Sequence, residues 1–164
     1  MQRGSNISKR QDAVKSARFA GDALSELVAH VFRLNGLLTS AGDAMAAPAG
    51  QTGARWRVLA AIDRAPLTVP QIARAWWLSR QSVQRVADVL VAEGFAVYEE
   101  NPGHRRSKLL RITPKGSSSL RSIRRAQRTW ADDLGGEIGE SDLRTANAIL
   151  ARVVEGLSRR EPVA

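Results

Sequence analysis

Side chains suited to recognition chemistry gather in two short segments of this chain, residues 79–85 and 105–108. Arginine can donate two hydrogen bonds to guanine, glutamine can bond adenine through two atoms, and serine hydroxyls suit phosphate oxygens. This combination predicts contacts to the bases and backbone of duplex DNA. The candidate DNA-contacting residues are Ser79, Arg80, Gln81, Ser82, Gln84, Arg85, Arg105, Arg106 and Lys108.

A helix over residues 80–93 is predicted to position the first segment. Ser79 is a residue type that caps helices, and Gly94 is placed to end this one. Helical spacing predicts one buried face, made of Val83, Val86, Ala87, Leu90 and Val91. The polar side chains of the other face then point outward, where they suit base edges and phosphates: Arg80, Gln81, Gln84, Arg85 and Asp88.

A shorter helix over residues 69–76 and a hairpin complete the pattern around this helix. Thr68 and Gln71 have capping-box spacing, and Pro70 lies in the first turn. Two strands over residues 95–99 and 107–112 are joined by a loop that contains the turn sequence Asn-Pro-Gly. Two helices followed by a basic hairpin predict that the second helix fills a major groove while Arg106 reaches a neighbouring minor groove.

Apolar stripes at both ends of the chain predict further helices. One runs from about Gln11 to Met45; another opens at Thr113-Pro114 and is expected to break at Gly135-Gly136, before Ser141 caps a last helix. One small domain cannot cover three such stripes, so we expect a homodimer. The stripes are Leu24, Leu27, Val31, Leu34 and Leu38; Leu120, Ile123, Gln127, Trp130 and Leu134; and Leu143, Ala146, Leu150, Val153 and Leu157.

The predicted fold is mainly α with a small β wing, a winged helix-turn-helix core flanked by N- and C-terminal dimerisation helices. The expected boundaries are residues 1–52 for the first dimerisation helix and its loop, 53–116 for the DNA-binding core, and 117–164 for the C-terminal dimerisation helices. Within the core, Thr52 or Gly53 is expected to begin a helix over residues 54–63.

The charge of the chain is concentrated in its middle. The 164 residues carry a formal net charge of +9, and residues 53–116 alone hold 11 Lys or Arg against 5 Asp or Glu. An excess of positive charge on this segment would neutralise phosphates. The alternative is an arginine-rich genome composition, which explains the total charge more easily than its placement.

The arrangement resembles the MarR family of winged helix-turn-helix regulators over nearly the whole chain. The most specific similarity is the wing motif, which reads His104-Arg105-Arg106, then Ile112-Thr113 and Gly116; residues 54–59 and 78–83 are also similar. The resemblance implies a homodimer that binds a near-palindromic operator, with occupancy usually relieved by a small ligand, often a phenolic acid. We therefore expect a ligand-responsive transcriptional repressor whose partners are operator DNA and a small aromatic effector.

Two residues depart from the family pattern. His104 replaces the wing aspartate; an exposed histidine there is solvated, contacts a phosphate or gives mild pH sensitivity. Trp77 occupies the place where helix-turn-helix proteins usually have a turn glycine. A positive φ would strain a tryptophan, so we expect a slightly different turn in which Trp77 shields the core.

Other large side chains have two interpretations each. Trp56, Trp76 and Trp130 are expected in the core, and the alternative for Trp56 is an aromatic ligand pocket between the first helices and the DNA-binding core. A solvated helix face is expected from four arginines, with a second DNA contact as the alternative: Arg121, Arg124, Arg125 and Arg128.

The remaining function classes are excluded or disfavoured. No catalytic motif is present, so the chain is not expected to be an enzyme. There is no cysteine, and His30 and His104 lie on different elements, so neither a metal nor a cofactor is expected. No secretion signal or membrane span is evident, which indicates the cytoplasm. The alternative function is a winged-helix protein-interaction module, which would need an apolar outward face on residues 80–93.

Overall fold

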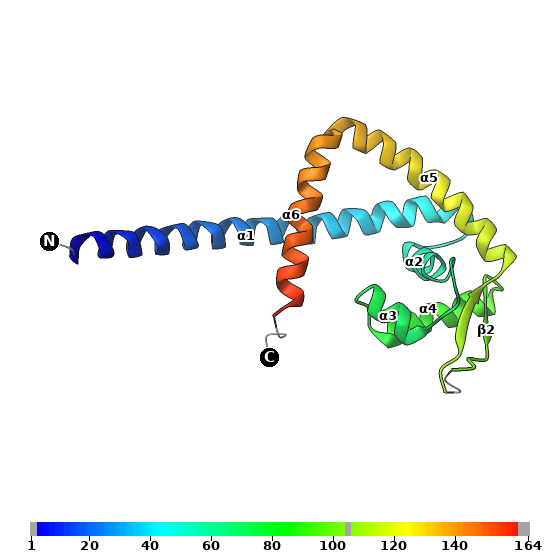
Figure 1. The fold of residues 1–164 in the computed structure, drawn as a ribbon. Coiled ribbons are helices and arrows are strands. Elements are labelled where there is room, and N and C mark those ends of the chain that lie inside the picture. Colours follow the sequence, from blue (N-terminus) through cyan, green and yellow to red (C-terminus); the bar gives the residue numbers. More distant parts are fainter. Residues whose placement is uncertain (1–2, 104–105, 161–164) are drawn as a thin grey trace.

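The computed structural model describes residues 3–103 and 106–160, with side chains from residue 19 onward in the first helix. It confirms a mainly α fold with a small antiparallel sheet (Figure 1). The elements in chain order are α1 (Arg3–Ala46), the 3-10 turn η1 (Ala47–Ala49), α2 (Gly53–Ala61), β1 (Leu67–Thr68), α3 (Val69–Ala75), α4 (Arg80–Ala92), β2 (Ala96–Glu99), β3 (Leu109–Ile112), α5 (Pro114–Ile138) and α6 (Glu140–Ser158). We call α2 to β3 the winged-helix core, and α1, α5 and α6 the terminal helices.

The sheet has the strand order β1-β3-β2, and both pairings are antiparallel. Tyr98 of β2 and Leu67 of β1 both lie opposite Leu110 of β3. Both hairpin strands are shorter than predicted, and no strand was predicted at residues 67–68, which form β1. Two residues are too few for a readable alternation, so pairing with β3 alone makes this segment a strand.

The hydrophobic core lies between α2, α3, α4, the sheet and the first turns of α5. Its largest fully buried side chains come from each of these elements: Val58, Leu59, Ile62, Ile72, Val83, Leu90, Leu110, Leu120 and Ile123. Of the inward residues predicted for α4, Val83, Ala87 and Leu90 are buried, and Val86 and Val91 are half-buried. The helix packed this way presents its polar face to solvent.

Side-chain caps begin four helices, α2 to α5, at the predicted residues. Thr68 and Gln71 form the capping box of α3, since Gln71 Oε1 accepts from the Thr68 N–H at 2.8 Å and Thr68 Oγ1 accepts from the Gln71 N–H at 3.4 Å. Thr52, Ser79 and Thr113 cap α2, α4 and α5, each through a side-chain oxygen that accepts one hydrogen bond from a backbone N–H of the helix. These caps satisfy amide groups that have no partner inside their own helix.

Gly116 is required where the wing meets α5. A Cβ at this position would lie 2.1 Å from the Phe95 carbonyl oxygen and 2.8 Å from Ile112 Cγ1. Thr113 fixes the same junction, because its hydroxyl donates to the Gly94 carbonyl at 2.8 Å and its N–H donates to the Phe95 carbonyl at 3.1 Å. The glycine of the wing motif is therefore a packing requirement.

Trp77 ends α3 in the left-handed conformation, with φ of 52°. The Leu78 N–H donates to the Ala73 carbonyl at 2.9 Å and the Trp77 N–H to the Arg74 carbonyl at 3.4 Å, the pattern of a Schellman motif. The expectation of a different turn in which Trp77 shields the core is wrong in both parts, since φ is positive and Trp77 is 87% exposed. Trp76 is also outside the core at 45% exposure, because α3 ends one residue before it. Trp56 and Trp130 are half-buried.

The terminal helices correct three predicted boundaries. The first, α1, begins at Arg3 instead of Gln11. In α5 the helix continues through Gly135-Gly136, because a helical glycine costs only about 1 kcal/mol, and it ends at Gly139, whose φ is 91°. Gly139 also occupies the N-cap position of α6, so Ser141 is not the cap. In Figure 1 α5 leads away from the core and α6 returns across α1. No helix in the described part of the chain is apolar enough over a sufficient length to cross a membrane.

Candidate nucleic-acid interface

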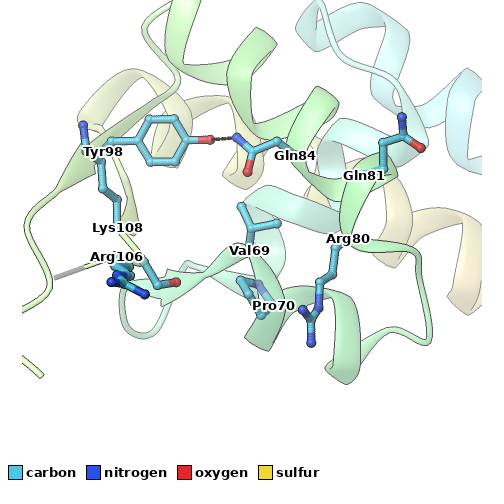
Figure 2. A pocket seen from close by; sticks show the side chains of 9 residues that line it. Val69, Pro70, Arg80, Gln81, Gln84, Tyr98, Arg106 and Lys108 are labelled. Carbon is cyan, nitrogen blue, oxygen red and sulfur yellow. Dashed lines mark hydrogen bonds between the residues drawn. The ribbon is translucent and has the colours of Figure 1, made fainter. Parts of the chain in front are cut away.

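A groove of about 620 Å³ lies between α4 and the wing (Figure 2). It brings together five of the predicted DNA-contacting residues, from two segments about 25 residues apart: Arg80, Gln81, Gln84, Arg106 and Lys108. Val69, Pro70, Tyr98 and Ser107 complete its lining. In Figure 2 Arg80 lies on one side of the groove, and Arg106 and Lys108 lie on the other. The groove thus has cations on both walls, with Val69, Pro70 and Gln84 between them.

The other candidates lie outside this groove. Ser79 is exposed, and its Oγ accepts a hydrogen bond from the Ser82 N–H at 3.1 Å, so it serves as the N-cap of α4. Ser82 is half-buried, and Arg85 is exposed on α4. Arg105 and His104 lie outside the described residues.

The position of α4 is set from both ends. At its start, the Ser79 cap and the turn at Trp77 direct the chain into the helix. At its end, Arg55 of α2 donates two hydrogen bonds to the Glu93 carboxylate, at 3.0 and 2.6 Å. Together with the buried apolar face, these contacts hold the polar face of α4 in a fixed direction.

A hydrogen-bonded triangle links α4 to the wing, and sequence reasoning missed it. Gln84 Nε2 donates to Asp88 Oδ1 and to Tyr98 Oη, and the Tyr98 hydroxyl donates to Asp88 Oδ1, each at 2.8 Å. We call this the Gln84–Asp88–Tyr98 triangle. Burial, followed by the hydrogen bond to Asp88 and its negative charge, raises the pKa of Tyr98 to about 12. The i, i+4 spacing of Gln84 and Asp88 was visible in the sequence, but the contact with Tyr98 depends on how β2 packs on α4.

The wing has its own polar contacts. Arg111 Nε donates to Glu99 Oε1 at 2.6 Å, and this hydrogen bond lowers the pKa of the Glu99 carboxyl. Asn101 organises the predicted turn, because its Oδ1 accepts from the Gly103 N–H and its Nδ2 donates to the Ser107 carbonyl, both at 3.0 Å. The two strands are therefore tied together below the segment that carries Arg106 and Lys108.

A second, smaller hollow lies between α1 and α2. It has a volume of about 230 Å³ and is lined by Asn35, Leu38, Thr39, Gly42, Gly53, Trp56 and Arg57. Trp56 packs against the hydrophobic core, as predicted, and also lines this hollow, and ligand binding beside it stays a prediction.

The arginines of α5 lie apart from the groove between α4 and the wing, and Arg125 lines a separate hollow on α5. The four arginines of α5 are exposed, and Arg124 pairs with Asp63 at 2.7 Å. Among the residues that the structure describes, no group of three or more histidine, cysteine, aspartate or glutamate side chains could hold a metal ion.

Comparisons with known proteins agree with this geometry. The model of the MarR family matches residues 49–107, which include α2, both helices of the helix-turn-helix and the wing to its tip. An uncharacterized protein of Mycobacterium tuberculosis is 38% identical over 141 residues, which cover 86% of this chain and 99% of the relative.

Two solved structures share the fold. The transcriptional repressor CouR bound to a 23-mer DNA duplex is 26% identical, with a TM-score of 0.69 over 80% of this chain and 94% of its own. Staphylococcus aureus MarR in complex with salicylate and kanamycin is 14% identical, with a TM-score of 0.73 over 84% and 93% of the two chains. Family model, fold and the groove between helix and wing agree, and the chain belongs to the MarR family of transcription regulators, which are not enzymes.

Proposed function

We propose that this chain is a cytoplasmic, sequence-specific repressor that binds a near-palindromic operator as a homodimer. The observation that carries the proposal is the groove that Arg80, Gln81 and Gln84 of α4 line together with the wing cations Arg106 and Lys108. A capped helix with an outward arginine and glutamine face suits a major groove, and a neighbouring cationic hairpin suits the minor groove beside it.

Within this interface the residues have separate roles. Gln81 and Arg80 lie in the first turn of α4 and are proposed to read bases, with Gln84 and Arg85 one turn further on. Ser79 and Ser82, at the helix N-terminus, suit phosphate oxygens. Arg106 is proposed to enter the minor groove, while Arg105 and Lys108 contact the backbone.

The terminal helices supply the proposed dimer interface. Their apolar side chains are exposed over long stretches, for example Phe32 at 74%, Leu37 at 61% and Leu157 at 62%. A hollow of about 450 Å³ between α1 and α6, lined mainly by leucine, isoleucine and valine, is open to a further helix. A surface of this kind on a single chain is typical of an unfilled subunit interface. We propose dimerisation segments at residues 1–52 and 117–164 around a DNA-binding core at 53–116.

Repression is the proposed sign of regulation. A dimer that covers two successive major grooves blocks access of other proteins to the same DNA, and the related CouR is named a repressor.

The hollow beside Trp56 supports a ligand-responsive regulator. Its volume of about 230 Å³ lies below the roughly 300–1,000 Å³ of sites for drug-sized ligands, so it suits a single aromatic ring. Trp56 offers the ring a face, and Arg57 offers a carboxylate a partner. Tryptophan fluorescence during titration with salicylate tests this proposal, and Arg57→Gln is expected to weaken binding of salicylate more than of uncharged phenol. Equal effects on the two ligands would contradict a carboxylate contact.

DNA binding is tested by selection of bound fragments from genomic DNA, followed by titration of variants on a matched set of mutated operators at two salt concentrations. The selected site is expected to be an inverted repeat with half-sites roughly 34–36 Å apart. Gln81→Ala should relax preference at one position by about 1–3 kcal/mol. Arg106→Ala should weaken binding to all sequences and lower the salt slope by about 1.

The main competing function is a protein-interaction module with the same fold. A protein of that kind would bind no selected duplex more tightly than bulk DNA. A selected site that contains only one asymmetric half-site would contradict the proposed binding of a symmetric dimer. If Gln81→Ala and Arg106→Ala both left DNA binding unchanged, the assignments of helix and wing would be wrong, and the arginine face of α5 would be the next candidate.

A further inference from the structure

The Asp88 carboxylate determines which end of the Gln84 amide faces the wing. A carboxylate only accepts hydrogen bonds, so the amide nitrogen of Gln84 must lie against Asp88. Tyr98 favours the same orientation, because its hydroxyl donates to Asp88 and therefore accepts from Gln84. The carbonyl oxygen of Gln84 is thus the end of the amide that the triangle does not hold.

The two glutamines of α4 differ in this respect. Gln84 and Tyr98 line the groove, and Figure 2 shows Gln84 extending toward Tyr98, whereas Gln81 extends away from the wing. Asp88 is not part of the groove lining, so it supports Gln84 from outside the surface that meets a ligand. Within the described residues, Gln81 makes no side-chain hydrogen bond and its amide is free to turn.

The held amide changes what Gln84 can read. Glutamine recognises adenine by donating and accepting side by side, which needs both ends of the amide. In the triangle the nitrogen is engaged, and the carbonyl oxygen can accept from the amino group that cytosine or adenine presents in the major groove. Guanine and thymine present acceptors at the corresponding positions, which repel this oxygen.

We infer that Asp88 and Tyr98 are specificity-determining positioning residues, which hold Gln84 so that its carbonyl oxygen selects cytosine or adenine at the base position that it contacts. The inference rests on the proposed binding of DNA through α4. It adds two residues that would touch no base to the set that decides the operator sequence.

The triangle is well supported on the wing side. Tyr98 is half-buried in β2, opposite the fully buried Leu110 of β3, so its ring is anchored to the core. The pKa of Tyr98, raised to about 12, keeps the phenol protonated, so it remains a donor to Asp88 throughout the physiological range. Release of Gln84 toward a bidentate contact would break the hydrogen bonds of its nitrogen to Asp88 and Tyr98.

The test measures base preference on duplexes taken from genomic selection. Gln84→Ala first identifies the position that Gln84 contacts, as the one where preference changes. At that position the wild-type protein is expected to favour cytosine or adenine about tenfold over guanine and thymine. Asp88→Asn is expected to reduce this preference to about twofold, because asparagine can donate as well as accept and the Gln84 amide can then turn and present either end. Tyr98→Phe is expected to reduce the preference to an intermediate value, because Asp88 still faces the Gln84 nitrogen but one of its N–H groups is released. Salt dependence should stay unchanged, since no phosphate contact is removed.

Two comparisons separate positioning from a general structural role. Glu99→Gln weakens another hydrogen bond of β2, the one with Arg111, and should leave base preference unchanged. In a Gln84→Ala background, Tyr98→Phe should cause no further change in preference, since its effect passes through Gln84.

The outcomes distinguish this inference from the proposed function. If wild-type protein binds no selected duplex, DNA binding itself fails. If Gln84→Ala changes base preference while Tyr98→Phe and Asp88→Asn leave it unchanged, DNA binding stands and the positioning role is refuted. A change with Asp88→Asn but not with Tyr98→Phe would mean that Asp88 contacts cytosine directly, which also overturns the inference.

Discussion

The winged-helix core and the terminal helices bury their apolar side chains in different ways. In the core, side chains from six elements meet within one chain, and Leu59, Ile72, Leu90 and Leu110 are fully buried. On the terminal helices, leucines and valines at regular helical spacing remain exposed. The apolar faces of amphipathic helices are therefore covered in the winged-helix core and left exposed on the terminal helices.

This difference shows that helical periodicity indicates which apolar surface must be covered, but not whether the same chain or a second chain covers it. The core covers its own apolar side chains because short helices and a sheet pack around one another. The terminal helices are too long for the rest of the chain to cover. We therefore expect substitutions in the core to change the stability of the folded monomer, and substitutions on the terminal helices to change the oligomeric state.

The largest effect is expected from Gly116→Ala, which tests the close packing of the core. The new Cβ would lie 2.1 Å from a backbone oxygen, so β2 and α5 would have to separate. Loss of more than about 4 kcal/mol of unfolding free energy is expected, measured by chemical denaturation.

Gly136→Ala is the matched control in the same helix. Gly136 is helical and nothing lies within 4 Å of its added Cβ, so this change should stabilise the protein by about 0.4–1 kcal/mol. Equal destabilisation by both substitutions would contradict the contrast between the two regions.

Leu34→Glu tests the terminal helices. Leu34 is 47% exposed and lines the hollow between α1 and α6, so a carboxylate there should prevent dimerisation and leave the core folded. Sedimentation should give a monomer, and affinity for a palindromic operator should fall by about 100-fold or more, because each subunit must then bind its half-site alone.

Ala29→Glu places the same charge elsewhere on α1, away from this hollow, and should remain dimeric. A wild-type chain that sediments as a monomer at micromolar concentration would remove the basis of this prediction and of the proposed dimer.

Trp77→Gly tests strain at an exposed site of the core. Relief of the left-handed conformation favours the variant by about 1–2 kcal/mol, and the greater freedom of glycine in the unfolded chain offsets about 0.4–1 kcal/mol. A net stabilisation of about 0.5 kcal/mol is expected, seen as a higher Tm. A lower Tm would show that the exposed indole makes a stabilising contact in the assembled protein.

The smallest effect is expected from alkaline titration, which reports on the core alone because Tyr98 is the only tyrosine. Its pKa is raised from 10.0 to about 12, so its stabilising contribution is complete below pH 10 and is lost as the pH rises toward 12. Tyrosinate absorbance should therefore appear at a pH about two units higher than for an exposed tyrosine. In Asp88→Asn it should appear earlier, and an unshifted wild-type titration would contradict both the burial of Tyr98 and its hydrogen bond to Asp88.

Much of the fold could be predicted from local sequence signals. The caps at Thr68, Ser79 and Thr113 depend on side chains and amides within one turn, and the structure confirms them. The buried face of α4 follows from spacing alone, and so does the position of the wing turn. The convergence of two basic segments on one groove follows from the family's topology, which the resemblance supplied.

The failures share a physical cause. Gly135-Gly136 only weakly favours a helix break, and α5 continues through both residues. Trp77 adopts a conformation that its residue type disfavours, because the hydrogen bonds of the Schellman motif and the packing of α3 on α4 determine the turn. In both places the contacts around a residue outweigh its own preference.

The caps of α2 to α5, the basic face of α4 and the apolar stripes of the helices could be predicted without a structure, because each depends on residues a few positions apart along the chain. Three features could be seen only in the folded chain: Tyr98 contacts Gln84 and Asp88, Gly116 has no room for a side chain, and Trp56 lines a hollow as well as the core. These depend on distances between segments that are remote in sequence, and the packing of the whole core sets those distances.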